Sequence, residues 1–175
     1  MIEALRGLGY STSSALADII DNCIAAEASK VDVEFVWAGK SSYVTILDEG
    51  RGMDAADLER AMRLGDRNPL DPRAPGDLGR FGLGLKTASF SQCRRLTVAS
   101  RQAGSVSCLR WDLDEIAATG GHEWELLEGT APGSEQLLAV LPPEEPGTLV
   151  AWEVMDRILT SGFRHLLKRQ RIAIC

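Results

Sequence analysis

One stretch of the sequence, GDLGRFGLGLKTASFS at residues 76–91, constrains the fold more than any other because it holds four glycines in its first nine residues. Glycine adopts backbone conformations that other residues rarely reach, and residues 83–90 are typical of a helix, so a loop must lead directly into a helix here. Two familiar phosphate-binding loops do not fit. A P-loop has Gly-Lys-Ser/Thr, whereas Leu85 precedes Lys86 and Thr87; a dinucleotide fingerprint has G-x-G-x-x-G after a strand, whereas this order is G-x-x-G-x-G after a polar loop.

The bulk properties predict a single globular domain. A chain of 175 residues supports about one domain, and we expect residues 1–175 to be an N-terminal fragment of a longer protein because the sequence ends within an apolar run. The formal charge of −6 argues against a mainly electrostatic grip on nucleic acid or a membrane. The four cysteines form no C-x-x-C pair, and no apolar run reaches about 18 residues. These features predict no zinc site, no disulfide framework, no membrane span and a reducing, cytoplasmic setting.

Hydrophobic patterning predicts an α+β fold, a two-layer sandwich in which helices cover one face of a mostly antiparallel mixed sheet. The predicted elements are, in order, a helix at 15–28, a hairpin of strands at 31–38 and 42–48, a short helix after Asp54, a helix at 83–90, strands near 95–101, 105–112, 123–128, 136–141 and 147–155, and a terminal helix from about Ser161. Residues 65–80 are rich in Gly, Pro and Asp, and a loop of this length is typical of a functional lid or a disordered segment.

Three polar residues stand in the middle of the first predicted helix, in the segment ALADIIDNCIAA. Asp18, Asp21 and Asn22 are spaced i, i+3 and i+4, so their side chains fall on one stripe of the helix. Isoleucines and alanines surround them, and a buried carboxylate without a partner is costly. The stripe therefore favours a functional site over a solvated surface.

A carboxylate closes the second predicted strand, in the segment LDEGRGM. Asp48 stands just before Gly50 and Gly52, whose backbone tolerates positive φ and the close approach of a ligand. In that position, Asp48 is suited to accept a hydrogen bond from an exocyclic amine deep in a pocket. Taken alone, the segment is also compatible with a simple turn.

The glycine-rich stretch favours an anion site. Gly79, Gly82 and Gly84 expose successive backbone N–H groups where a helix begins, and there the amides and the helix dipole favour negative charge. Lys86 adds a mobile positive charge. A purely structural glycine loop is the alternative. Near the end of the chain, Thr148 opens an apolar strand after the residues EPG, where a threonine is by itself an ordinary strand residue.

The order of these motifs resembles the GHKL ATPases, a family with the Bergerat ATP-binding fold that includes gyrase B subunits, MutL, the large heat-shock chaperones and MORC proteins. The shared order is DIIDN, then DEGRGM, then GRFGLGLKT, then GT before a strand, and it spans residues 15–152, nearly the whole chain. The form GRFGLGLK followed by TASFS is most similar to the MORC-like branch and its prokaryotic relatives. The resemblance implies ATP and Mg²⁺ as ligands.

The resemblance assigns a role to each matching position. Asn22 would bind Mg²⁺ through its amide oxygen, Asp48 would bind the adenine amino group, and Thr148 would support that contact through a water molecule. The base pocket would be lined by Gly50, Gly52 and Met53. The β- and γ-phosphates would be wrapped by Gly79, Arg80, Phe81, Gly82, Leu83, Gly84, Lys86 and Thr87. Residues 65–80 would be a lid that closes over ATP.

Two positions depart from the family pattern. Asp18 stands where most relatives have a glutamate as general base, and its carboxylate is one methylene shorter. A displacement of about 1 Å can reduce a rate on the order of 100-fold, so slow hydrolysis is expected. Ala25 stands where many relatives have an aspartate, which removes a polar neighbour of the site. Asp18 and Lys86 are the predicted catalytic residues.

The resemblance implies a conformational switch, because in the related proteins ATP orders the lid and draws two copies of the domain together. We therefore expect ATP and ADP as ligands, Mg-dependent ATP binding, slow hydrolysis and a nucleotide-dependent homodimer, with any DNA bound through regions outside this chain. A non-hydrolysing ATP sensor that dimerises on nucleotide is the alternative. A histidine kinase is disfavoured because both histidines, His122 and His165, lie far after the first predicted helix.

Overall fold

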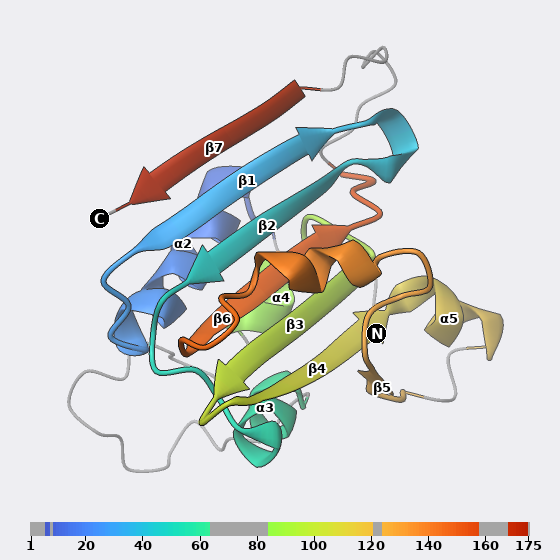
Figure 1. Ribbon diagram of the computed structural model, residues 1–175. Helices are drawn as coiled ribbons and strands as arrows, with labels where there is room; N and C mark the ends of the chain where they lie inside the picture. Colours follow the sequence, from blue (N-terminus) through green and yellow to red (C-terminus); the bar gives the residue numbers. More distant parts are fainter. Residues whose placement is uncertain (1–5, 8, 64–83, 121–123, 158–167, 175) are drawn as a thin grey trace, which may run out of the picture.

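The computed structural model describes residues 6–7, 9–63, 84–120, 124–157 and 168–174. These residues form a seven-stranded sheet in the order β5-β4-β3-β6-β2-β1-β7, in which every neighbouring pair is antiparallel (Figure 1). The strands are β1 (Val31–Trp37), β2 (Tyr43–Asp48), β3 (Arg95–Gln102), β4 (Ser105–Asp112), β5 (Leu127–Glu128), β6 (Gly147–Glu153) and β7 (Lys168–Ile174). The helices are α2 (Thr12–Ala25), α3 (Ala55–Met62), α4 (Gly84–Phe90), α5 (Leu113–Ala118) and the 3-10 helices η1 (Gly39–Ser41) and η2 (Glu135–Val140).

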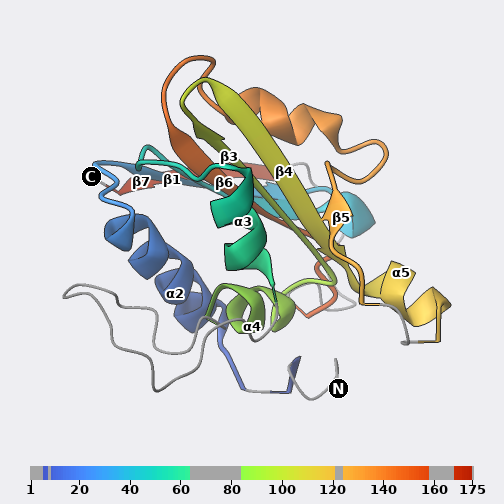
Figure 2. The same cartoon turned by 90° about the horizontal axis from the view of Figure 1, so that it is seen from below.

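The sheet and the helices form layers, as the sequence predicted. α2, α3 and α4 lie on one face of the sheet, and η2 lies on the other (Figure 2). The larger core fills the space between the sheet and the α-helices and includes Ile19, Val98 and Trp152. A smaller core under η2 includes Leu137 and Leu149. The predicted α+β fold is confirmed, with η2 as an additional cover on the second face.

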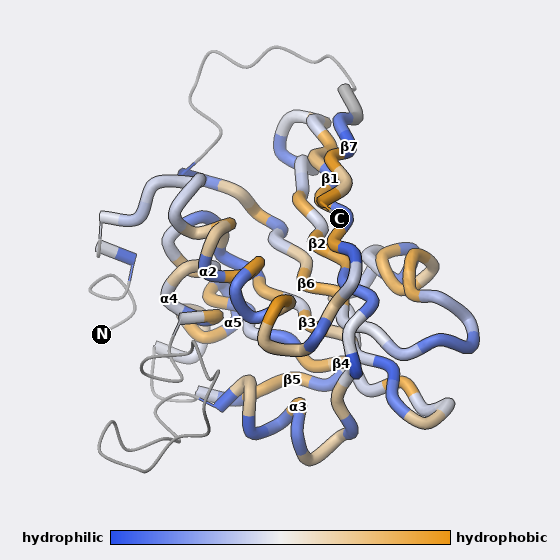
Figure 3. Tube along the Cα trace, turned by 90° about the vertical axis from the view of Figure 1, so that its left-hand side faces the viewer, coloured by the Kyte–Doolittle hydropathy of each residue, from blue (hydrophilic) through white to orange (hydrophobic). Residues whose placement is uncertain are grey.

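The β1–β2 hairpin follows from the alternation of apolar and polar residues along its strands. Val33 and Ile46 are partners in the register, and both join the larger core. The connection passes through Gly39, whose φ is +59°, and through η1. Figure 3 shows the hydrophobic stretches of β1 and β2 beside more hydrophilic turns. The register of the hairpin fixes where β2 ends, which is at Asp48.

The connection between β4 and β6 differs from the prediction. The strand predicted at 136–141 is wrong, because Glu135–Val140 is the 3-10 helix η2. A short apolar run carries no period that separates strand from helix, and the burial of Leu137 in the smaller core decided between them. The strand predicted at 123–128 is reduced to β5, and residue 123 lies outside the described residues. The helix α5, which is capped by the Asp112 side chain, was not predicted.

The terminal helix predicted from about Ser161 is wrong for the part that the structure describes. Residues 168–174 form β7, whereas residues 158–167 lie outside the described residues. β7 pairs with β1 along its whole length, because the open edge of β1 offers backbone donors and acceptors that local periodicity does not anticipate. Arg171 on β7 donates to the Asp32 carboxylate at 2.6 Å, and this hydrogen bond lowers the pKa of Asp32.

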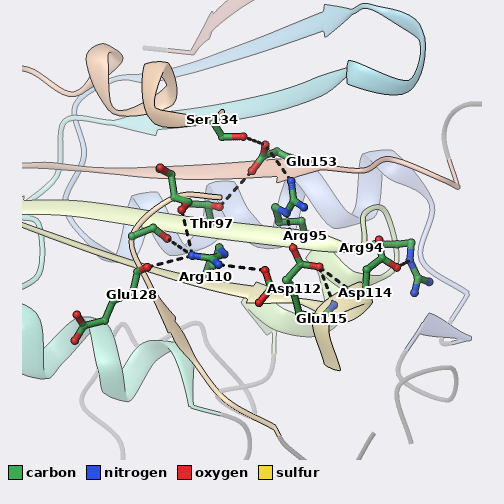
Figure 4. Close-up of polar contacts among 12 residues, drawn as sticks. Arg94, Arg95, Thr97, Arg110, Asp112, Asp114, Glu115, Glu128, Ser134 and Glu153 are labelled. Atoms are coloured by element: carbon green, nitrogen blue, oxygen red, sulfur yellow. Dashed lines mark hydrogen bonds and ion pairs between the residues drawn. The ribbon is translucent and has the colours of Figure 1, made fainter. Parts of the chain in front are cut away.

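A polar network at one end of β6 holds the segment between β5 and η2 against the sheet by hydrogen bonds (Figure 4). The buried Glu153 lies 3.8 Å from the Arg95 guanidinium. Arg110 donates to three backbone carbonyls at residues 128–130, at distances between 3.1 and 3.4 Å. Thr148 lies at the other end of β6, so this network is separate from the motifs that predict a binding site.

Candidate functional site

α2 carries the first predicted motif on its outward side. The helix begins after Ser11, whose hydroxyl caps it by accepting a hydrogen bond from a backbone amide of the first turn. Its buried residues are Ala15, Ile19 and Cys23. Asp18 is half-buried, and Asp21 and Asn22 are exposed. The polar stripe therefore faces away from the core, where a ligand can reach the Asn22 amide.

Asp18 links α2 to the beginning of α4. Its Oδ2 accepts a hydrogen bond from the Tyr10 hydroxyl at 2.8 Å. A methyl group placed on Gly84 would lie 3.9 Å from the same carboxylate oxygen. The pKa of Tyr10 is raised, chiefly by its hydrogen bond to Asp18. The structure therefore brings together the first predicted motif and the described end of the glycine-rich stretch.

Asp48 lies at the end of β2 with 4% of its surface exposed. Burial raises the pKa of its carboxyl group, and the Gly50 amide, the Cys23 side chain and the Thr148 amide offset this effect in part. The Gly50 amide donates to Oδ1 at 2.9 Å. Because Cys23 follows Asn22 on α2, the helix that carries Asn22 also contacts Asp48. A buried carboxyl group with a raised pKa is a typical feature of functional sites.

The segment after Asp48 is held between α2 and β3 by close backbone approach. At Gly52, whose φ is +65°, an added methyl group would stand 1.9 Å from the Arg101 carbonyl oxygen. At Gly50, it would stand 2.8 Å from the Ala26 carbonyl oxygen. Neither position has room for a side chain. The fold itself therefore requires both glycines, whichever ligand the site takes.

Three polar side chains from adjacent strands form a row across the sheet beside this segment. Asp48, Thr148 and Ser100 occupy paired positions on β2, β6 and β3. The Ser100 and Thr148 hydroxyl oxygens lie 2.9 Å apart, and Ser100 Oγ accepts a hydrogen bond from the Met53 amide at 2.8 Å. Sequence reasoning missed Ser100, because nothing in its local sequence separates it from other strand serines. The pairing of β3 with β6 identifies it.

Lys86 on α4 is 1% exposed, and its ammonium group donates to the carbonyl oxygens of Ala61 and Arg63 at 2.8 and 2.6 Å. These two carbonyls lie at the end of α3, where a helix cannot satisfy its own last acceptors. Lys86 therefore fastens α3 to α4, a role that sequence reasoning missed. Its predicted contact with phosphate stays a prediction. The neighbouring Thr87 hydroxyl donates to the Gly84 carbonyl at 3.4 Å.

Part of the predicted phosphate site cannot be placed. The predicted phosphate-binding residues Gly79, Arg80, Phe81, Gly82 and Leu83, and the predicted lid at 65–80, lie outside the described residues. In the part of the chain that the structure describes, no three His, Cys, Asp or Glu side chains group as metal ligands. None of the helices in the described ranges has the length and apolar character needed to cross a bilayer.

Comparison with known proteins gives consistent matches. Residues 10–148 match the family described as "Histidine kinase-, DNA gyrase B-, and HSP90-like ATPase". "DNA mismatch repair protein MutL" of Allorhizobium ampelinum is 33% identical over 161 residues, which cover 91% of this chain and 22% of that protein. "ATPase morc-1" of Caenorhabditis elegans is 26% identical over 96 residues, 55% of this chain and 11% of that protein. "ATPase MORC2B" of Mus musculus is 30% identical over 101 residues, 54% of this chain and 10% of that protein. This chain therefore spans 22% or less of these relatives.

Proposed function

The chain belongs to the family of histidine kinase-, DNA gyrase B- and HSP90-like ATPases, and from this premise we propose that it binds ATP with Mg²⁺ and hydrolyses the nucleotide slowly. The resemblance to GHKL ATPases is confirmed at the family level, since MutL and MORC proteins both occur among the relatives. One observation carries the proposal. α2 contacts Asp48 through Cys23 and approaches Gly84 through Asp18, so a single helix links the end of β2 to the glycine-rich stretch.

The end of β2 would hold the adenine base. Asp48 would accept the hydrogen bond of the exocyclic amine, and Thr148 would support this contact through water, with Ser100 as its partner. The backbone of Gly50, Gly52 and Met53 would line the base pocket. Support comes from the burial of Asp48, because a desolvated acceptor discriminates strongly against a base that offers no donor.

The Asn22 side chain would hold the magnesium ion. The position fits this ion, because an amide oxygen on an exposed helix face suits a cation that keeps several waters and takes few protein ligands besides phosphate oxygens. When bound, Mg²⁺ neutralises phosphate charge. Gly79, Arg80, Phe81, Gly82, Leu83 and Gly84, together with Lys86 and Thr87, are proposed to surround the β- and γ-phosphates.

Asp18 is proposed to accept a proton from the water molecule that attacks the terminal phosphate. Phosphoryl transfer is catalysed mostly by positioning and charge stabilisation, so an aspartate in place of the longer glutamate slows turnover without abolishing nucleotide binding. Slow turnover suits a switch. We propose that ATP closes the lid at 65–80 and joins two copies of the domain, and that hydrolysis resets them. We further propose an action on DNA, which the names of the MutL relatives support.

A non-hydrolysing ATP sensor is the second candidate. It is favoured by the Asp18 side chain, which is one methylene shorter than glutamate. Both candidates predict ATP binding and dimerisation. They differ only in the release of phosphate.

Phosphate release and ATP affinity of the full-length protein separate the two candidates. The ATPase proposal predicts slow release by the natural protein and about 100-fold less by Asp18→Asn, with ATP affinity retained in both. Asp114→Asn is the matched control, because Asp114 is exposed and pairs with Arg94 away from the site. ATP binding without phosphate release in the natural protein would reject the ATPase in favour of the sensor.

A further inference from the structure

The Asp18 carboxylate has a neighbour that the proposed mechanism does not use. Tyr10 precedes α2, and its hydroxyl donates to Asp18 Oδ2 at 2.8 Å. Asp18 is half-buried beside Gly84, so this hydrogen bond lies next to the glycine-rich stretch. The Asp18 hydrogen bond is the largest cause of the raised pKa of Tyr10, which keeps the phenol protonated as a donor, whereas the Thr87 side chain acts in the opposite direction.

Tyr10 is itself held in place by the turn that follows α4. Gln92, which is 2% exposed, donates from its amide nitrogen to the Tyr10 carbonyl oxygen at 3.5 Å. The Thr12 hydroxyl donates to the amide oxygen of the same glutamine at 2.8 Å. A second bond from the glutamine nitrogen, to Ser91 Oγ at 2.8 Å, fixes the orientation of this amide. The segment that presents the phenol is therefore anchored at the Tyr10 carbonyl and at the Thr12 hydroxyl.

We propose that Tyr10 is a positioning residue for Asp18: its hydroxyl holds Oδ2, so that Oδ1 is presented to the attacking water. This inference rests on the proposed ATPase function. A carboxylate torsion at the end of a side chain is broad and roughly two-fold, so a free aspartate samples many orientations. One fixed oxygen removes that freedom, and the carboxylate keeps lone pairs on the other oxygen for a second donor.

The proposal explains how the departure from glutamate is tolerated. The aspartate side chain is shorter and places its carboxylate closer to the helix, where the phenol of Tyr10 can reach it. A glutamate at position 18 would carry its carboxylate one methylene beyond this contact. Tyr10 therefore acts through Asp18, and its hydroxyl is expected to matter for catalysis only when the Asp18 carboxylate is present.

The test measures kcat and KM for phosphate release, and the dissociation constant of a non-hydrolysable ATP analogue, in the full-length protein. Tyr10→Phe keeps the ring and removes only the hydroxyl. We expect its kcat to fall about tenfold while KM and analogue affinity stay within about twofold, because orientation and not binding is lost. Tyr43→Phe is the matched control, since Tyr43 on β2 is the other tyrosine of the chain, and it should leave all three quantities unchanged.

A double-mutant cycle tests the pairing. In an Asp18→Asn background, Tyr10→Phe should produce no further fall in kcat, and in an Asp18→Glu background its effect should be below about twofold. A kcat of Tyr10→Phe within twofold of the natural protein, or an equal fall in every background, overturns the proposal. An equal fall in kcat in every background would mean that Tyr10→Phe damages the structure in general. The cycle therefore tests the pairing of Tyr10 with Asp18 even if Tyr10→Phe lowers the melting temperature.

The outcomes also separate this inference from the function on which it rests. If Asp18→Asn releases phosphate as fast as the natural protein, the assignment of Asp18 as general base fails, and the role of Tyr10 fails with it. If Asp18→Asn is inactive and Tyr10→Phe is fully active, the proposed function stands and the inference about Tyr10 is wrong.

Discussion

At the scale of single residues, two glycines share a left-handed backbone and differ in their surroundings. Gly52 has φ +65° with the Arg101 carbonyl in the space of a side chain, whereas Gly104 has φ +80° with nothing within 4 Å. An alanine at either position is strained, because its Cβ atom disfavours positive φ, and this strain costs about 1–2 kcal/mol. Only Gly52 adds a clash between two backbone segments.

We predict that Gly52→Ala lowers the free energy of unfolding by at least about 3 kcal/mol, and that Gly104→Ala, as its matched control, lowers it by about 1–2 kcal/mol. The difference measures the close approach alone, because the two changes share the strain of positive φ. Urea denaturation of both variants gives the two values. Equal losses would show that the segment after Asp48 moves aside easily.

The buried Asp48 predicts a characteristic pH dependence. Its folded-state pKa is raised by burial above the ordinary value of 3.8, so between these two pKa values the folded protein binds more protons than the unfolded chain. The contribution of Asp48 to stability is therefore lost as the pH rises through this window. Asp48→Asn cannot ionise, so the free energy of unfolding of this variant should rise relative to that of the natural protein as the pH increases from 3.8 through the raised pKa of Asp48.

Urea denaturation across this pH range measures the difference between the two proteins. Glu135→Gln is the matched control, and its difference in unfolding free energy from the natural protein should change with pH in the opposite direction. Backbone amides lower the pKa of Glu135, so its charge stabilises the fold at higher pH. A difference for Asp48→Asn that does not change with pH would refute the desolvation of this carboxyl group.

The same variant should bind ATP at least about tenfold more weakly, since a hydrogen bond to a charged group contributes about 1.5–3 kcal/mol.

At the scale of elements, Lys86 on α4 holds the end of α3 through two hydrogen bonds. Lys86→Met keeps much of the apolar stem of Lys86 and leaves the Ala61 and Arg63 carbonyls without their ammonium donor. We predict a loss of about 1–3 kcal/mol in the free energy of unfolding in the absence of nucleotide. Lys40→Met, at an exposed position in η1, is the control and should have little effect. An unchanged stability of Lys86→Met would show that these two hydrogen bonds do not stabilise the fold.

Several elements were predictable and others were not. The capped helix α2, the β1–β2 hairpin and α3 follow from signals within about ten residues, namely caps, alternation and turn residues. η2 and β7 do not. Leu137 is equally compatible with a strand until the second face of the sheet requires a cover, and residues 168–174 pair with β1 because an open edge is available there.

At the scale of the whole molecule, the proposed switch predicts a change of assembly. With Mg²⁺ and a non-hydrolysable ATP analogue, the full-length protein should become a dimer in sedimentation velocity experiments, whereas with ADP it should not. Asn22→Ala should fold with unchanged stability, because this side chain is exposed, and should stay monomeric with the analogue. The natural protein should gain about 2.7 kcal/mol of stability at an analogue concentration 100 times its dissociation constant.

The Asn22→Ala variant can also contradict the proposed magnesium ligand and the proposed switch. If this variant binds the analogue with the affinity of the natural protein, in calorimetry with Mg²⁺ present, the assignment of the magnesium ligand is wrong. If it loses binding and still dimerises, assembly does not depend on nucleotide and the switch is rejected.

The sequence by itself determined the α+β class, the helix with its polar stripe, the strand that ends at Asp48 and the family resemblance, because caps, periodicity and motif order depend on residues close along the chain. Only the tertiary structure decided that Asp48, Thr148 and Ser100 form a row, that Tyr10 reaches Asp18, and that Lys86 fastens α3. Those contacts depend on the register between strands and on the packing of helices, which join segments far apart in the sequence. No local pattern encodes them.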